Sequence, residues 1–149
     1  MVVKLTDKIS ENFTYGEVIR SPLAAGLGMS NDLPIELLPK IQLLTKHILE
    51  PTRLHFNKPI IITSWWRCKA LNQMISNNLD SQHTKAEAVD WKVQDVNNLK
   101  VAEWIRDNLV FDQLILERSW IHTSYVDYRL NREEVLTCYD SRTYKKGLK

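Results

Sequence analysis

The sequence lacks the features that would place the chain in several specialised classes of protein. Its only two cysteines, Cys68 and Cys138, are far apart and show no paired spacing, so neither a disulfide framework nor a cysteine-type zinc site is indicated. No apolar run approaches the length of a membrane span, and the N-terminus lacks the apolar core of a signal peptide. The net charge of +2 is too small to indicate nucleic-acid binding. We therefore expect a protein made in the cytoplasm, with no membrane span and no nucleic-acid partner.

The composition is that of an ordinary globular protein. The 149 residues suit one domain with a single core, and contents of 44% hydrophobic and 26% charged residues are typical of such domains. No internal repeat, linker or low-complexity tract divides the chain. We expect a monomer with one domain over residues 1–149 and peripheral segments at 1–9 and 141–149. The basic, polar tail from Ser141 onwards is predicted to be frayed.

The spacing of apolar residues predicts an α+β protein in which helices pack on one mostly antiparallel sheet. Pro39 is tolerated only near the start of a helix, and Pro51 is expected to kink the end of the same helix. The predicted helices cover 15–20, 22–25, 39–50, 67–76 and 96–108, and the predicted strands cover 59–64, 87–93, 112–116, 120–126 and 134–139. The residues expected to face the core from the last two helices are Leu71, Ile75, Leu99, Ala102, Ile105 and Leu109.

The stretch 81–90 carries the clearest functional signal. It holds His83 and Asp90 seven residues apart, a spacing that suits a loop followed by a short strand. An imidazole nitrogen and a carboxylate oxygen are good Zn²⁺ ligands, and a catalytic zinc needs three protein ligands and an open position. Among the other histidines, only His122 lies in a strand-like run, where alternation sends residues 120, 122 and 124 to one face. These three residues are therefore a candidate zinc site.

Each of these residues also has an ordinary structural interpretation. His83 can cap a loop, Asp90 can pair with a base, and His122 can be an interior imidazole. His47 and His55 lie on the long helical region and its exit without matching partners, so we interpret both as non-ligands.

The candidate ligands belong to a longer pattern. Ser81 stands two positions before the histidine, an Ala-x-Asp ends the stretch at Asp90, and a Trp-x-His follows at Trp120 to His122. This pattern resembles the zinc D-alanyl-D-alanine carboxypeptidase and L-alanyl-D-glutamate endopeptidase family, which includes small bacteriophage endolysins and prophage proteins. Other segments that resemble family positions are 11–14, 48–51, 61–64 with Arg67, 70–72 and 111–115, so the likeness covers roughly residues 10–137.

The resemblance implies the Hedgehog/DD-peptidase fold and a zinc metallopeptidase that cleaves the peptide stems of bacterial peptidoglycan. Zinc would be the cofactor, polarising the scissile carbonyl and lowering the pKa of a bound water, the nucleophile, to about 7. Which of the two bonds is cut stays open. The chain has no wall-binding repeat and so resembles a minimal lysin or a phage accessory protein, acting at the cell wall after release or as a virion component.

Glu117 is the candidate general base. If residues 118–119 form a two-residue turn, Glu117 faces Trp120 across a hairpin and shares a face with His122. The resemblance also implies an acidic residue shortly before the Trp-x-His, although several family members carry it three residues before the histidine, where this chain has Ser119. The alternative is a turn carboxylate paired with Arg118, in which case the next candidate bases are Glu87 and Asp112.

The resemblance assigns a second catalytic role to Arg67. In the family, an arginine in Ser-x-Tyr-Arg-Ser stabilises the oxyanion of the tetrahedral intermediate, a task that suits a guanidinium because it stays charged and offers a rigid donor fork. The alternative is a surface arginine at the start of a helix. Ser81 and Gln82 are candidates for hydrogen-bonding the substrate, although Ser81 can equally cap its loop. Trp120 is a candidate for lining the cleft.

Several positions depart from the family pattern, namely Trp65, Trp66, Cys68, Ala86 and Ser119. Ala86 stands where the family usually has glycine, and an alanine held at positive φ costs about 1 kcal/mol or more. Two functions therefore stay open. One is a peptidoglycan-cleaving enzyme, and the other is a catalytically weakened, zinc-binding relative that serves as a phage structural or wall-binding component.

Overall fold

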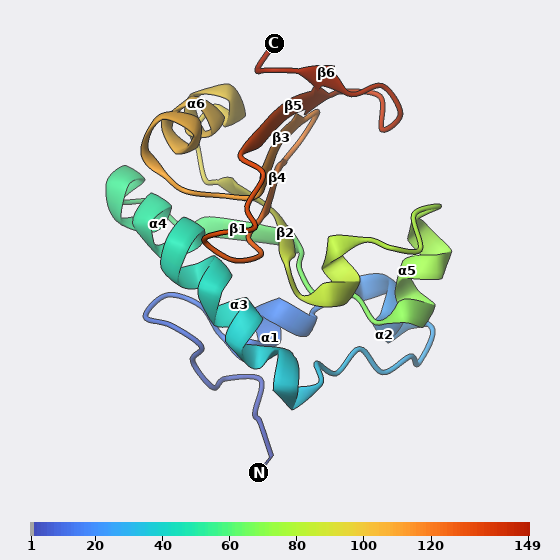
Figure 1. The fold of residues 1–149 in the computed structure, drawn as a ribbon. Helices are drawn as coiled ribbons and strands as arrows, with labels where there is room; N and C mark the ends of the chain where they lie inside the picture. Colours follow the sequence, from blue (N-terminus) through green and yellow to red (C-terminus); the bar gives the residue numbers. More distant parts are fainter. Residues whose placement is uncertain (1) are drawn as a thin grey trace.

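A six-stranded sheet runs through the middle of the molecule, which is described over residues 2–149 by a computed structural model (Figure 1). The strands are β1 (Ile60–Ser64), β2 (Ala88–Val93), β3 (Gln113–Glu117), β4 (Ile121–Ser124), β5 (Glu134–Cys138) and β6 (Lys145–Lys146). The α-helices are α1 (Tyr15–Ile19), α2 (Pro22–Gly26), α3 (Leu38–Leu44), α4 (Glu50–Phe56), α5 (Lys69–Ile75) and α6 (Asn98–Asn108). Two 3₁₀-helices, η1 (Ile35–Leu37) and η3 (Gln82–Lys85), and a π-helical turn, η2 (Thr45–Leu49), complete the fold.

The sheet is mixed but mostly antiparallel. Its strand order is β1-β2-β4-β3-β5-β6, and only β3 and β5 run parallel. The expected α+β architecture is therefore confirmed. The predicted tight turn between β3 and β4 is also present, because the Glu117 N–H donates to the Trp120 carbonyl at 3.0 Å.

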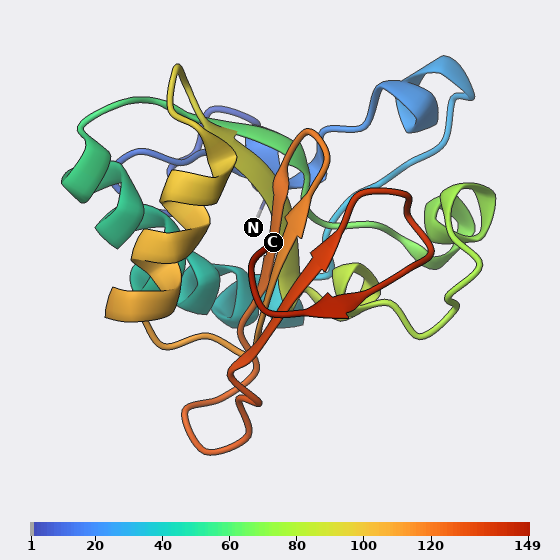
Figure 2. The same ribbon diagram turned by 90° about the horizontal axis from the view of Figure 1, so that it is seen from above.

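Alternation along the strands gives the sheet two different faces. One face carries apolar side chains such as Trp91, Leu114 and Ile121, which are fully buried. Helices α3, α4 and α6 lie on this side, whereas α5 lies on the other side (Figures 1 and 2). The opposite face carries polar groups, and it is the face on which the candidate site residues lie. No helix within residues 2–149 combines the length and the apolar character that crossing a membrane requires.

The long helical run tolerates both of its prolines. Pro39 lies in the first turn of α3, where a missing N–H costs nothing. Pro51 lies in the first turn of α4, and the π-helical η2 directly precedes it. Because proline cannot donate to the α-helical ladder, a widened turn at this point lets the chain continue as a helix to Phe56.

Three details of the sequence prediction are wrong. Ile75 and Leu99 are 49% and 38% exposed, because Ile75 ends α5 and Leu99 lies in the first turn of α6, where Val101 is buried instead. The tail is not frayed, since residues 145–146 pair with β5 as β6. The Thr137 hydroxyl holds this tail by donating to the Gly147 carbonyl at 2.7 Å and accepting from the Lys149 N–H at 3.0 Å.

Candidate active site

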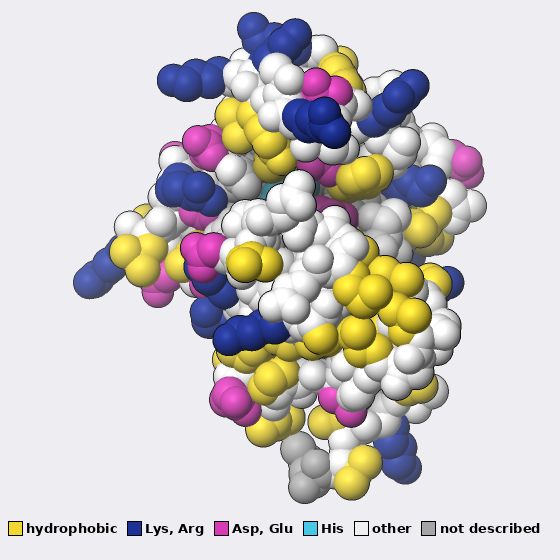
Figure 3. Space-filling view, turned by 90° about the vertical axis from the view of Figure 1, so that its right-hand side faces the viewer, with side chains coloured by type: hydrophobic (Ala, Val, Ile, Leu, Met, Phe, Trp, Pro, Cys, Tyr) yellow, Lys and Arg dark blue, Asp and Glu magenta, His cyan; other side chains and the backbone are white. Residues whose placement is uncertain are grey.

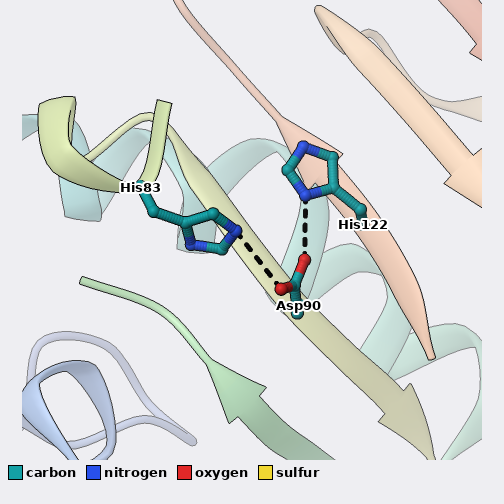
Figure 4. Close-up of side chains that lie close together, drawn as sticks. All are labelled: His83, Asp90 and His122. Atoms are coloured by element: carbon teal, nitrogen blue, oxygen red, sulfur yellow. Dashed lines mark hydrogen bonds and ion pairs between the residues drawn. The ribbon is translucent and has the colours of Figure 1, made fainter. Parts of the chain in front are cut away.

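Three potential metal ligands meet on the polar face of the sheet. Asp90 on β2 stands directly opposite His122 on β4, and His83 lies in η3, just before β2. Asp90 Oδ1 is 2.8 Å from His122 Nδ1, and Asp90 Oδ2 is 3.3 Å from His83 Nε2 (Figure 4). The ligand atoms of the three side chains all lie within 4.8 Å of one another. The group is therefore compact enough to hold a single metal ion.

A backbone carbonyl sets the orientation of His83. Its Nδ1 lies 2.6 Å from the carbonyl oxygen of Trp65, so Nδ1–H donates there and Nε2, which faces Asp90, keeps its lone pair. This is the arrangement typical of a metal-ligating histidine, whose second nitrogen is anchored by a carbonyl or carboxylate. The Ser81 hydroxyl accepts the His83 backbone N–H at 3.3 Å and thereby caps η3.

The electrostatics of the group favour the protonation states that bind a cation. Burial alone raises the pKa of Asp90, but the charge of His83 and the hydrogen bonds from both imidazoles bring it well below its ordinary value. Burial lowers the pKa of His83, which is 3% exposed. At neutral pH the site therefore presents an ionised carboxylate and a neutral His83, which are the ligand forms that zinc requires.

Ala86 ends η3 in the left-handed conformation that the sequence comparison suggested. Its φ is 60° and its ψ is 28°, and its side chain is fully buried. Its N–H donates to the Gln82 carbonyl, so the turn that carries His83 closes normally despite the strain. An L-residue with a Cβ costs about 1–2 kcal/mol in this region, which the surrounding packing must offset.

The ligand group lies on the wall of a cleft of about 830 Å³. Figure 3 shows this hollow in the middle of one face, with histidine and acidic side chains at its floor and basic side chains around its rim. All of the predicted site residues line the same cleft: Arg67, Ser81, Gln82, His83, Asp90, Glu117, Trp120 and His122. By contrast, Ser119 lines a separate hollow with β2 and the start of α6, so it does not share the cleft with the ligands.

Arg67 is held beside the ligand group by three side chains. Its Nη2 lies 3.5 Å from Asp90 Oδ2, its Nε donates to the Ser64 hydroxyl at 3.1 Å, and its Nη1 donates to Asn72 Oδ1 at 3.1 Å. Its side chain is only 13% exposed. Arg67 is therefore a partly buried, oriented cation in the cleft and not a surface arginine.

Glu117 shares the cleft with the ligands but lacks an ion-pair partner among residues 2–149. Burial is the main cause that raises its pKa to about 7, and the negative charge of Asp90 raises it further, while His122 and Arg67 oppose the shift. The alternative bases are already paired. Glu87 Oε2 is 2.9 Å from Lys40 Nζ, and Asp112 Oδ2 is 2.7 Å from Arg132 Nη2.

The chain matches the model of a known protein family. A family model described as peptidase M15 matches residues 11–124, which is more than half of the chain. The chain belongs to the peptidase M15 family. Peptidases of this family are zinc-dependent, so membership supports a peptide substrate and a metallopeptidase activity. No curated protein matches the chain.

In this M15 family member, the candidate substrate-binding residues differ in whether their side chains already make hydrogen bonds within the protein. The Ser81 hydroxyl accepts the His83 N–H and so caps η3. Gln82 Nε2 donates to Asp112 Oδ2 at 2.9 Å. The Trp120 indole N–H has no hydrogen-bond partner within residues 2–149 although it lines the cleft. Trp120 is thus the one of the three whose polar side-chain atom makes no hydrogen bond to the described residues.

Two groups of residues in or beside the M15 cleft were not predicted in the roles that they have, although Asp112 had been considered as an alternative base. Asp112, which is 1% exposed, accepts hydrogen bonds from the Arg132 side chain, the Ser124 hydroxyl and Gln82. This network joins the residue before β3 to β4, the loop before β5 and the helix η3 that carries His83. The other group is Ser141, Arg142 and Tyr144, which line the cleft from the C-terminal tail. Only the polarity and basic charge of the tail were visible in the sequence.

His47 and His55 take no part in the ligand group. The His47 ring stacks on Tyr125 with centroids 4.4 Å apart, and the His55 ring stacks on Trp104 at 4.3 Å. Both histidines lie on the helical run that covers the apolar face of the sheet. The interpretation of both as non-ligands therefore agrees with their surroundings.

Proposed function

We propose that this protein is a zinc metallopeptidase that cleaves the peptide stems of bacterial peptidoglycan, at a D-Ala-D-Ala or an L-Ala-D-Glu bond. The observation that carries the proposal is the convergence, in one cleft, of the three donor atoms with an oriented arginine and an unpaired, partly buried glutamate. Because peptidoglycan lies in the cell wall, we propose that the protein acts there after release or as a component of a virion.

The donor set fits zinc. His83 Nε2, an oxygen of Asp90 and His122 Nδ1 form a two-imidazole, one-carboxylate set, which is the kind used at catalytic zinc sites with an open position. When bound, zinc supplies Lewis-acid chemistry, polarising a carbonyl and lowering the pKa of water towards about 7. The Trp65 carbonyl keeps the His83 ring oriented for this task.

The remaining residues have distinct roles in hydrolysis. The Glu117 carboxylate accepts a proton from the attacking water and later delivers it to the leaving amine, a cycle that suits a carboxylate whose pKa is raised by burial. The Arg67 guanidinium stabilises the negative charge that develops on the scissile carbonyl oxygen. Its anchoring by Ser64 and Asn72 means that little reorganisation accompanies the reaction.

The alternative is a catalytically weakened relative that keeps the fold and the metal. The left-handed, buried Ala86 is the observation that favours it, because strain in the turn that carries His83 acts directly on a ligand. In this case the protein would bind zinc and the wall peptide without turning it over.

The test is hydrolysis of purified peptidoglycan by the zinc-loaded protein, followed by identification of the released peptides. We expect turnover by the parent and loss of both zinc and turnover in His83→Ala and His122→Ala. His55→Ala removes an exposed histidine away from the cleft and serves as the control, which should keep one zinc per chain. A parent that holds zinc but releases no peptide supports the weakened relative, and a parent that holds no zinc contradicts both.

A further inference from the structure

The C-terminal tail forms one wall of the cleft. Residues 125–149 follow the part of the chain that matches the family, and they include β5, β6 and the turn between them. In Figure 2 this turn, in red, reaches towards α5, in green. Its contribution to the lining comes from Ser141, Arg142 and Tyr144. These side chains lie outside the segment that the family model matches.

The turn is firmly held. Asp140 Oδ1 accepts the backbone N–H groups of Arg142 at 2.9 Å and Thr143 at 2.6 Å. Pairing of β6 with β5 and the two bonds of the Thr137 hydroxyl anchor the far end of the tail. The Arg142 side chain therefore projects from a fixed turn at the edge of the cleft.

Arg142 is also the cation of the cleft that lacks an acidic partner. Three other basic residues line the cleft, and each is paired: Arg67 with Asp90 at 3.5 Å, Lys85 with Asp80 at 2.9 Å, and Arg132 with Asp112 at 2.7 Å. Within residues 2–149, Arg142 has no acidic group within ion-pair distance, and the nearby Asp140 is turned to the backbone. Its guanidinium is thus available to a ligand.

We propose that Arg142 forms a carboxylate-binding subsite, which holds a free carboxylate of the peptide during cleavage. This inference rests on the proposed function and adds a determinant of substrate choice to it. A guanidinium suits the task because its planar fork can bind both oxygens of a carboxylate. Since Arg142 is exposed at the cleft edge, its charge also attracts anionic peptides and acts on binding more than on the chemical step.

Three synthetic peptides test the subsite and identify the carboxylate. The first is a stem peptide that contains L-Ala-D-Glu, has lysine at its third position and ends in D-Ala-D-Ala. The second carries a C-terminal amide, and the third carries D-isoglutamine in place of D-Glu. We expect Arg142→Ala to raise KM for the unmodified peptide about tenfold, the size of one hydrogen bond to a charged group, with little change in kcat.

The modified peptides show which carboxylate Arg142 contacts. The modified peptide that lacks this carboxylate should bind the parent about tenfold more weakly than the unmodified peptide does, and Arg142→Ala should not weaken its binding further. The other modified peptide, which keeps this carboxylate, should behave like the unmodified peptide with both proteins. Arg142→Lys, which keeps the charge without the fork, should lie between parent and Arg142→Ala. Lys145→Ala is the matched control, because it removes one positive charge from the same tail at a residue that does not line the cleft.

Failure of the subsite and failure of the proposed function give different results. If Arg142→Ala weakens all three peptides equally, or none of them, the subsite does not exist. If the zinc-loaded parent cleaves none of them, the proposed function fails, and calorimetric binding of the same peptides still decides the subsite. The subsite is supported if the parent prefers the peptides that carry one particular carboxylate and Arg142→Ala loses this preference. The subsite is ruled out if the parent shows no such preference.

Discussion

At the scale of single residues, two carboxylates of one cleft are driven to opposite protonation behaviour. Imidazole hydrogen bonds and neighbouring charge lower the pKa of Asp90, whereas burial raises that of Glu117 to about 7. Such a divergence separates a group that stays ionised from one that exchanges protons near neutral pH. Asp90 is therefore suited to holding a cation, and Glu117 to transferring a proton.

Replacing Glu117 by glutamine tests this division of roles. Glu117→Gln keeps the shape but removes the proton acceptor, so we expect zinc content to stay near one per chain and kcat to fall by about 10²–10⁴-fold. Steady-state kinetics together with metal analysis measures both. Glu103→Gln, an exposed change on α6, is the control. An unchanged rate in Glu117→Gln would show that the base lies elsewhere.

The pH dependence of the parent follows from the same group. Glu117 must be ionised to accept a proton, so the rate should rise with pH and level off above the pKa of this carboxylate. Its value of about 7 refers to the cleft without a cation. A bound cation lowers it, so we expect the midpoint between the ordinary value of about 4.3 and 7. In Glu117→Gln, the plot of the residual kcat against pH should not show this fall on the acid side.

Arg67 is expected to act on the transition state. Removing an oxyanion-stabilising donor typically costs about 10²–10³-fold in kcat, so Arg67→Ala should lose this much while retaining zinc. Arg67→Lys keeps the charge but cannot reach Ser64, Asn72 and Asp90 together, and its rate should be intermediate. If the folded, zinc-loaded fraction of both variants turns over at the parental rate, the role of Arg67 is structural.

At the scale of secondary-structure elements, buried Asp112 joins segments that the sheet alone does not connect. It receives Arg132 from the loop before β5, Ser124 from β4 and Gln82 from η3. Burial on its own raises the pKa of Asp112, but these hydrogen bonds lower it well below the ordinary value. The network therefore favours the ionised carboxylate and ties the helix that carries His83 to the rest of the site.

We expect Asp112→Asn to lower the free energy of unfolding by about 1–3 kcal/mol at neutral pH, because it removes the charged acceptor from buried donors. Since folding lowers the pKa of Asp112, its contribution is complete above the unfolded value of about 3.9 and is lost as the pH falls below it. The difference between parent and variant should thus shrink in acid. Denaturant unfolding at several pH values measures it, and Arg129→Ala, on the exposed loop, is the control for loop changes.

At the scale of the whole molecule, the candidate ligands come from three elements, of which β4 is far from the other two in sequence. η3, β2 and β4 each supply one, so a cation that binds all three links them only in the folded state. A ligand that binds the native state alone stabilises it by mass action.

Zinc should therefore raise the thermal midpoint. At a free zinc concentration 100 times Kd the stabilisation is about 2.7 kcal/mol, and each kcal/mol corresponds to about 2–4 °C in a chain of this size. Differential scanning calorimetry with zinc and with a chelator measures the shift. It should be absent from His122→Ala and unchanged in His55→Ala, and it should fade in acid as the imidazoles become protonated. An equal shift in all three proteins would contradict a specific site.

The sequence by itself was sufficient for features that depend on local patterns. Alternation along 120–125 put Trp120 and His122 on one side, where both line the cleft, and the two-residue turn at 118–119 correctly paired Glu117 with Trp120. The strands and helices were recognisable for the same reason, because periodicities of two and of about 3.6 residues are written into neighbouring positions. Their ends were less exact, as Ile75 and Leu99 show, because burial in an end turn depends on what packs against it.

Only the tertiary structure decided the features that depend on residues distant in the chain. The orientation of His83 depends on the carbonyl of Trp65, and the pairing of Asp112 depends on Arg132. The raised pKa of Glu117 arises from burial within the cleft. The tail became part of the cleft through pairing with β5, although its composition alone predicted a frayed end. Long-range contacts of this kind leave no periodic trace in the sequence, because each of them is made by a few residues whose partners only folding brings near.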